Sequence, residues 1–80
     1  MAVHVFLGPE LKRKYRPDLE SGQAIAIEDG PGRTVAQIAR ELGIPLEEVT
    51  STIVAGHAVE SNYVASDGDS IFFLVAIGGG

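Results

Sequence analysis

The stretch SIFFLVAI at residues 70–77 is the most apolar segment of the chain, and it decides the fold. In an extended strand, successive side chains point to opposite faces of the sheet. The two faces of this strand would both be apolar, with Ile71, Phe73, Val75 and Ile77 on one and Phe72, Leu74 and Ala76 on the other. Such a pattern is typical of a strand in the middle of a sheet. We therefore expect residues 70–77 to form the central strand.

Residues 34–42 carry the clearest helix signal. Thr34 is a favourable N-cap, and Gln37 three positions later completes a capping box. Gly43 can adopt the positive φ that commonly ends a helix. The apolar residues between these signals recur at helical spacing, at Val35, Ile38, Ala39 and Leu42. A single apolar stripe of this kind predicts a helix that lies on a flat partner such as a sheet.

Shorter runs rich in β-branched residues predict further strands at residues 3–7, 23–28 and 50–54. The polar stretch at residues 8–22 contains two prolines, which predicts a long connection, and we expect one helical turn within it at residues 10–14. Another helical turn is expected at residues 45–49. Turns are expected at residues 29–32, 55–58 and 67–69.

This order of elements predicts an α+β fold in which one main helix crosses a small mixed sheet. The first two strands would pair antiparallel, and the last strand would lie beside the first and parallel to it. That arrangement is the β-grasp, with residues 1–77 as the domain and residues 78–80 as a flexible glycine tail. One helix covers only one face of the sheet, so the other face should expose an apolar patch that binds a partner. The candidate contact residues are Phe72, Leu74, Phe6 and Ile77.

The composition excludes several classes of function. Eighty residues, of which 45% are apolar and 21% charged, suit one ordinary globular domain. The chain has no cysteine, and therefore no disulfide, thiolate metal site or cysteine nucleophile. No apolar run reaches the ~18 residues of a membrane span, so we expect a soluble, cytoplasmic protein that does not contact membranes. A net charge of −5 argues against nucleic-acid binding, which needs a basic surface.

The basic residues gather in one place. Residues 12–16, from Lys12 to Arg16, hold four of the six basic side chains and one tyrosine. A basic run with an aromatic residue could contact RNA or a phosphate. On an acidic chain, a solvated or partner-docking loop is the favoured interpretation, and the sequence leaves the role of this loop open.

No catalytic constellation is evident. Two histidines, His4 and His57, do not make a metal site without clustered carboxylates or cysteine, so no metal is expected. Asp67 and Asp69 flank a glycine, which is typical of a turn rather than of an acid–base pair. We therefore expect a protein that is not an enzyme.

The glycines Gly78, Gly79 and Gly80 follow the last strand. Without Cβ atoms they form a thin segment that can enter a narrow tunnel in another protein. A terminal carboxylate on Gly80 would be ionised at neutral pH, with a reference pKa of about 3.5, and could attack a nucleotide phosphate. A ragged terminus without function is the alternative interpretation.

These features together resemble the ubiquitin-like sulfur carriers, the family of the molybdopterin synthase small subunit and the thiazole-synthesis sulfur carrier. The resemblance rests on the helix at residues 34–44, the hairpin at residues 54–56, and the turn at residues 67–69 followed by an apolar strand and a diglycine. Two positions depart from the family pattern. Ala55 stands where the family usually has asparagine, and Gly78 stands where a small non-glycine residue is common.

The resemblance implies a carrier whose Gly80 is adenylated with ATP by a ubiquitin-activating-type enzyme. A persulfide donor would convert the adenylate to a thiocarboxylate, and a synthase such as the molybdopterin synthase large subunit or thiazole synthase would accept the sulfur. The chain would itself bind no cofactor, as a carrier or a small non-catalytic subunit. The sequence does not decide between the two pathways. A protein modifier conjugated through Gly80 and a non-covalent β-grasp interaction domain are the alternatives.

Overall fold

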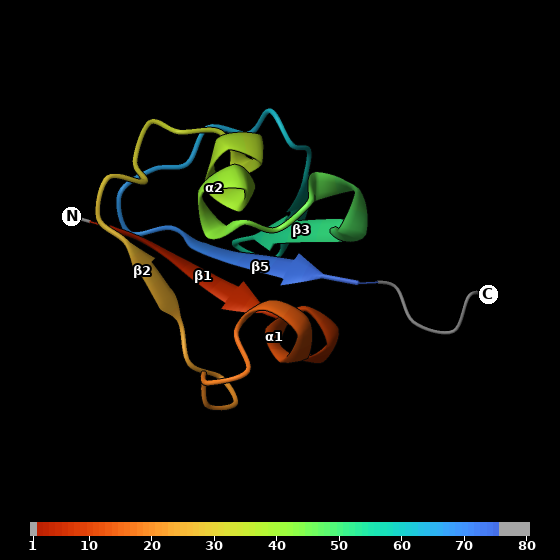
Figure 1. The fold of residues 1–80 in the computed structure, drawn as a ribbon. Helices are drawn as coiled ribbons and strands as arrows, with labels where there is room; N and C mark the ends of the chain where they lie inside the picture. The colour runs from red at the N-terminus through yellow and green to blue at the C-terminus, as the bar shows by residue number, and fades with distance from the viewer. Residues whose placement is uncertain (1, 76–80) are drawn as a thin grey trace.

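The computed structural model describes residues 2–75. Its elements follow the chain in the order shown in Figure 1. They are β1 (Val3–Leu7), α1 (Pro9–Tyr15), β2 (Ile25–Ile27), α2 (Val35–Leu42), the 3-10 turn η1 (Leu46–Glu48), β3 (Ser51–Val54), β4 (His57–Val59) and β5 (Ser70–Leu74).

The sheet has five strands in the order β2-β1-β5-β3-β4. β5 lies at its centre, parallel to β1 and antiparallel to β3. β1 and β2 pair antiparallel, as do β3 and β4. The α+β β-grasp fold predicted from the order of elements is therefore confirmed, including the central position of the last strand and its parallel pairing with the first.

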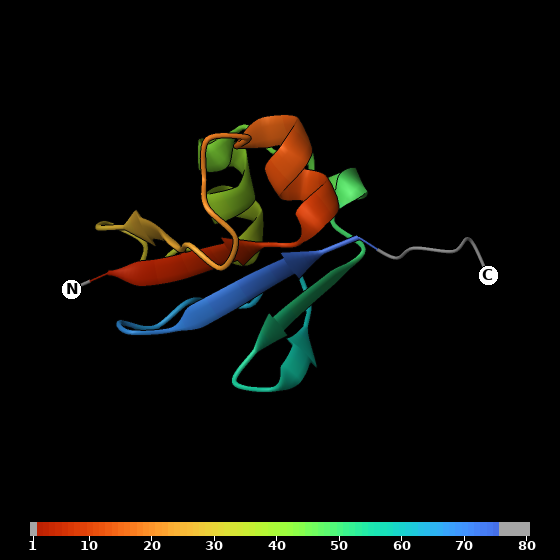
Figure 2. The same ribbon diagram turned by 90° about the horizontal axis from the view of Figure 1, so that it is seen from below.

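Both helices lie on one face of the sheet, as Figure 2 shows. The core forms between this face and the helices. Ile71 and Phe73 of β5 are fully buried there, and so is Ile38 of α2. The other apolar residues of the α2 stripe, Val35, Ala39 and Leu42, are buried as well. The flat partner that the stripe predicted is thus the inner face of the sheet.

The ends of α2 confirm the capping signals read from the sequence. The Gln37 amide donates to the Thr34 hydroxyl, and the Thr34 amide donates to the Gln37 side-chain oxygen, which completes the capping box. Gly43 ends the helix with φ 75°, and its amide donates to the Arg40 carbonyl. The helix therefore begins and ends where the sequence predicts.

Three predicted boundaries differ from the structure. The connection at residues 8–22 contains the seven-residue helix α1 rather than a single turn. Its signal was weak because only one of its residues, Leu11, is buried. The expected reversal at residues 55–58 is a two-residue turn, and His57 and Ala58 belong to β4, the second strand of the hairpin expected around residues 54–56. The strand expected at residues 23–28 narrows to Ile25–Ile27.

The strand expected at residues 70–77 is β5 as far as Leu74. Ala76, Ile77 and the predicted tail at residues 78–80 lie outside the described residues. Within residues 2–75, no helix is long and apolar enough to cross a membrane.

The β3–β4 hairpin turn offers a test of the local backbone. Ala55 has φ 53° and Gly56 has φ 81°, so both central residues are left-handed, as in the type I′ turn that asparagine–glycine favours. An alanine in this region costs about 1–2 kcal/mol relative to its preferred conformation. We predict that Ala55→Asn raises the free energy of unfolding by about 0.5–1 kcal/mol in a urea titration. Ala55→Val should lower it, because a β-branched residue fits this region less well than alanine.

Candidate functional site

The face of the sheet opposite the helices exposes one of the two aromatic residues of β5. Phe72 and Leu74 are 39% and 37% exposed, whereas Ile71 and Phe73, which alternate with them along the strand, are fully buried. The alternation predicted for this strand is therefore confirmed for residues 71–74. A shift of one residue would have reversed the assignment and placed Phe73 outside.

Phe6 of β1 lies directly beside Phe72. The parallel register pairs these two residues, and their rings stack with centroids 4.6 Å apart and planes 13° from parallel. On the other side of β5, the antiparallel register places Ile53 of β3 opposite Phe72. Three strands thus contribute to one apolar surface. We call it the apolar face and define it by Phe6, Ile53, Phe72 and Leu74.

The strand register shows what surrounds the apolar face. No carboxylate, lysine or arginine occupies the positions that the register aligns with it, which are His4, Ala26, Ser51, Ala58 and Ser70. A large apolar surface without charged neighbours is typical of the centre of a protein–protein interface. Three of the four predicted contact residues, Phe6, Phe72 and Leu74, thus lie together on this face. The fourth, Ile77, lies outside the described residues.

Two backbone hydrogen bonds hold the carboxyl end of β5 in place. The Gly8 amide donates to the Phe73 carbonyl, and the Thr50 amide donates to the Leu74 carbonyl, each at 2.9 Å. One bond comes from each side of the strand, so the direction in which the chain leaves the sheet is defined. Gly78, Gly79 and Gly80, the predicted reactive tail, follow in the sequence but lie outside the described residues.

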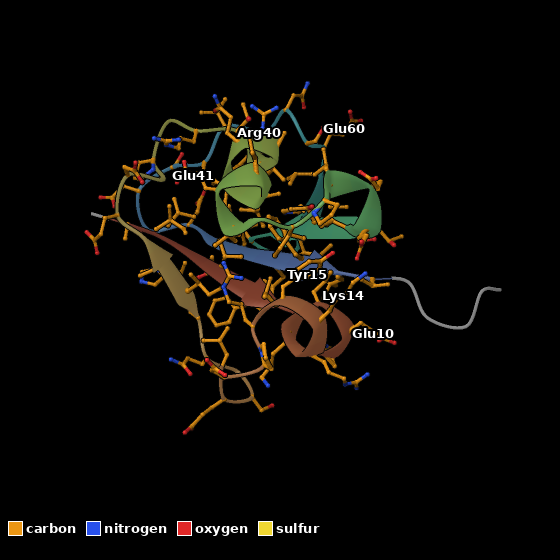
Figure 3. The ribbon with its side chains drawn as sticks, in the orientation of Figure 1. Glu10, Lys14, Tyr15, Arg40, Glu41 and Glu60 are labelled. Atoms are coloured by element: carbon orange, nitrogen blue, oxygen red, sulfur yellow. The ribbon has the colours of Figure 1, made fainter. Side chains whose placement is uncertain are left out.

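The basic residues of α1 do not act as one group. Lys14 Nζ contacts both carboxylate oxygens of Glu48 at 3.1 Å and so connects α1 to η1. This contact raises the pKa of Lys14. The pKa of Glu48 is lowered by the Tyr15 hydroxyl and by the Lys14 ammonium group. Figure 3 shows Glu10 and Lys14 on α1, close to the point where β5 leaves the sheet.

Arg16 makes the second connection from α1. Its guanidinium donates to the Leu42 carbonyl in the last turn of α2 and to the Tyr15 carbonyl, both at 2.8 Å. A basic side chain on the terminal carbonyls of a helix satisfies acceptors that lack partners within the helix. Sequence reasoning missed both connections, because Glu48 and Leu42 are 34 and 26 positions away from their partners.

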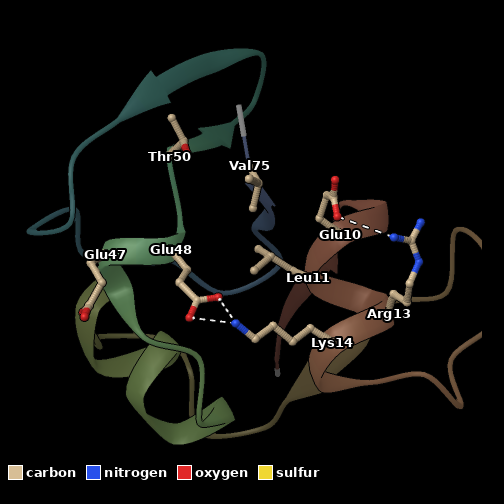
Figure 4. A pocket seen from close by; sticks show the side chains of 8 residues that line it. All are labelled: Glu10, Leu11, Arg13, Lys14, Glu47, Glu48, Thr50 and Val75. Carbon is tan, nitrogen blue, oxygen red and sulfur yellow. Dashed lines mark hydrogen bonds and ion pairs between the residues drawn. The ribbon is translucent and has the colours of Figure 1, made fainter. Parts of the chain in front are cut away.

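A groove of about 540 Å³ lies between α1 and η1 (Figure 4). Leu11 and Val75 contribute apolar side chains, and the Lys14–Glu48 pair spans it. Glu10 and Arg13 pair at 3.5 Å on its rim. Its lining contains three glutamates and two basic side chains, so the groove as a whole is not basic.

The acidic turn at residues 67–69 is structural. The Asp69 carboxylate accepts hydrogen bonds from the Tyr63 hydroxyl at 2.8 Å and the Ser66 amide at 2.9 Å. The hydrogen bond to Asp69 raises the pKa of Tyr63. Turn formation rather than acid–base chemistry therefore explains this carboxylate. Across residues 2–75, histidine and acidic side chains form no group of three or more that could bind a metal ion.

The sheet order, the helices on one face and the exposed face of β5 define a ubiquitin-like β-grasp protein. A family model described as Mut7-C ubiquitin matches residues 1–74. The chain therefore belongs to the Mut7-C ubiquitin family, which confirms that it is ubiquitin-like.

The fold is also that of a solved structure, the ubiquitin of Caldiarchaeum subterraneum. The two superpose with a TM-score of 0.57 at 17% sequence identity, over 100% of this chain and 98% of that one. A search of curated proteins found no significant match.

The contact between Arg16 and the end of α2 can be tested by stability measurements. Arg16→Met keeps an apolar stem but removes the charged donors from the Leu42 carbonyl. We predict a loss of about 1.5–3 kcal/mol in the free energy of unfolding, the range for a hydrogen bond that involves a charged group. Arg13→Met is the matched control and should change stability by less than about 0.5 kcal/mol, since its side chain is exposed. Equal losses in the two variants would contradict the capping role of Arg16.

Proposed function

We propose that this protein is a ubiquitin-like sulfur carrier, in which Gly80 is adenylated and then converted to a thiocarboxylate. The sulfur would be donated in the biosynthesis of molybdopterin or of the thiazole of thiamine. The observation that carries the proposal is the apolar face. Its centre, Phe72, lies on the same strand that leads, in sequence, to the three glycines. A partner docked on this face is therefore close to the start of the tail.

The proposed chemistry is confined to the Gly80 carboxylate and needs no catalytic group from this chain. A carboxylate oxygen attacks the α-phosphorus of ATP in an activating enzyme and releases pyrophosphate. The terminal sulfur of a partner's persulfide then attacks the carbonyl carbon and displaces AMP. A thiol of the partner attacks the resulting sulfur–sulfur bond, which leaves the thiocarboxylate on Gly80 and a disulfide on the partner. The thiocarboxylate sulfur finally passes to a precursor bound in the accepting synthase.

The described residues support a passive role for the folded domain. His4 and His57 lie on β1 and β4, which are not neighbours in the sheet. Asp69 is used in a turn, and Glu48 is paired with Lys14. The chain contains no cysteine, so a transported sulfur atom can be held only at the carboxyl terminus. ATP, the persulfide and the acceptor would all be bound by partners.

The anchored carboxyl end of β5 supports the same role. The hydrogen bonds from Gly8 and Thr50 hold Phe73 and Leu74, so a partner docked on the apolar face has a fixed position relative to the end of this strand. Reaction requires the carbonyl carbon to come within roughly 3–3.5 Å of its partner atom. Glycines suit this requirement because a channel around them can be narrow.

The proposed role of the tail in adenylation is tested by two variants, Gly79→Ala and the addition of one alanine after Gly80. Both should reduce ATP–pyrophosphate exchange by the activating enzyme to background, because the first widens the tail and the second displaces the reacting carbon. Thermal stability should be unchanged. An alanine added before Met1 is the matched control and should leave the exchange intact. Full exchange in both tail variants would exclude the carrier function.

The product of the reaction separates the carrier from the alternatives. Intact-mass measurement should show the exchange of one oxygen for one sulfur at Gly80. Linkage of Gly80 to lysines of other proteins would instead identify a protein modifier. Function retained after deletion of residues 78–80 would identify a non-covalent interaction domain.

The apolar face is tested by Phe72→Ala. Truncation of an aromatic residue at the centre of an interface typically costs about 2 kcal/mol, a loss of roughly 30-fold in affinity. We predict this loss in calorimetric titration with the activating enzyme. Val64→Ala is the matched control, because Val64 is 52% exposed but lies outside the apolar face. Equal losses in the two variants would show that the enzyme does not dock on this face.

A further inference from the structure

The structure separates the basic residues of the segment 12–16 into two pairs. Lys14 and Arg16 are engaged with Glu48 and with the end of α2. Lys12 forms no ion pair with any residue in the part of the chain described here. Arg13 contacts Glu10 at 3.5 Å with three-quarters of its side chain exposed, and exposed pairs of this kind contribute little. Lys12 and Arg13 therefore hold positive charge that the fold does not use.

These two side chains line a hollow of about 340 Å³, which we call the basic hollow. Its other walls come from the end of β1, the first residue of α1, and the loop between α1 and β2. They are formed by Leu7, Pro9, Pro17, Ser21 and Gly22. No carboxylate lines it. The basic hollow thus differs from the groove between α1 and η1, where three glutamates balance the basic residues.

The basic hollow lies in a positively charged part of an otherwise acidic protein. Residues 9–16 contain four basic residues and one glutamate, a net charge of +3, so the other residues together carry −8 within the total of −5. An acidic surface would be repelled by most of this molecule and attracted at α1. Such asymmetry orients a partner during encounter and rejects wrong orientations.

The hollow also lies at a defined place in the fold. α1 follows the carboxyl end of β1, and β1 is parallel to β5. The basic hollow is therefore at the end of the sheet where β5 terminates. Both helices lie on one side of the sheet (Figure 2), and the apolar face is on the other side, because Phe72 alternates with the buried Ile71 and Phe73. The two surfaces can be occupied at the same time.

We propose that the basic hollow binds an acidic segment of a protein partner, with a carboxylate held between Lys12 and Arg13. Leu7, Pro9 and Pro17 provide an apolar wall for a neighbouring side chain of that segment. The Ser21 hydroxyl supplies a further donor. A single-stranded nucleic acid is disfavoured because its bases need aromatic surfaces on which to stack, and none lines the hollow. This site is independent of the tail and of the carrier function.

The proposal is tested by NMR titration of the full chain with a synthetic peptide of alternating glutamate and leucine, blocked at both ends. The backbone amides of residues 12, 13 and 21 should shift. Affinity should fall as salt is added, because exposed charges are screened. The same peptide with glutamine in place of glutamate should bind at least roughly tenfold more weakly, since the charge contact is lost.

Variants of the protein make the test specific. Lys12→Glu and Arg13→Glu should each reduce the affinity for the acidic peptide roughly tenfold, while circular dichroism and the melting temperature stay unchanged. Arg40→Glu is the matched control: it changes the net charge equally but lies on α2, outside the basic hollow. It should bind like the parent.

Three results would overturn the proposal. The first is the absence of shifts at the basic hollow, and the second is an equal loss of affinity in Arg40→Glu and Lys12→Glu. The third is tighter binding of an oligouridylate of matched length than of the acidic peptide, which would identify a nucleic-acid site instead. None of these results bears on the tail, so the carrier function is tested separately.

Discussion

The pairing of β5 with β1 on one side and β3 on the other is the constraint on which the rest of this structure depends. It joins the two hairpin-like halves of the sheet, which are otherwise far apart in sequence. It also fixes which side chains of β5 face the helices. Ile71 and Phe73 complete the core, and Phe72 is consequently forced outward beside Phe6. The stability of the fold and its exposed contact surface are thus two results of one strand register.

The second organising feature is the position of α1. Leu11 anchors the helix in the core, while Lys14 and Arg16 connect it to η1 and α2. These contacts hold the helix against the same face of the sheet as α2. The two remaining basic residues, Lys12 and Arg13, are then presented together at the edge of a hollow. The position of this short helix therefore divides the basic residues of the segment 12–16 into two groups. Two of them make contacts within the fold, and the other two remain available to a partner.

Different regions of the molecular surface have different chemical character. One face of the sheet is apolar and bears no charged side chain at its centre, and the end of the molecule near α1 is basic. Most other charged residues are acidic. Complementary shape and charge are what recognition of a partner requires, and the two surfaces offer different kinds of both. For a carrier, a rigid domain that docks firmly leaves the reaction to the tail and to the partner.

The main elements were predictable from the sequence because their signals are local. The capping box at Thr34, the glycine stop at Gly43 and the alternation around Phe72 are all read within a few residues, and each agrees with the structure. The exposed position of Phe72 and Leu74 followed from strand alternation and from the expectation that a single main helix covers one face of the sheet. The unusual backbone of Ala55 could also be anticipated, since its neighbour Gly56 marks a tight hairpin.

Other features were decided only by the tertiary structure. The helix α1 depends on the burial of Leu11, and β4 depends on pairing with β3, so neither has a strong pattern of its own. The stack of Phe6 on Phe72 requires the parallel register between the first and last strands. The separation of Lys14 and Arg16 from Lys12 and Arg13 depends on partners 34 and 26 residues away. The sequence by itself thus determined the helix α2, the central strand β5 and the face that β5 buries, because those depend on neighbouring residues. Which charges remain available was decided by tertiary contacts, because it depends on groups brought together only by folding.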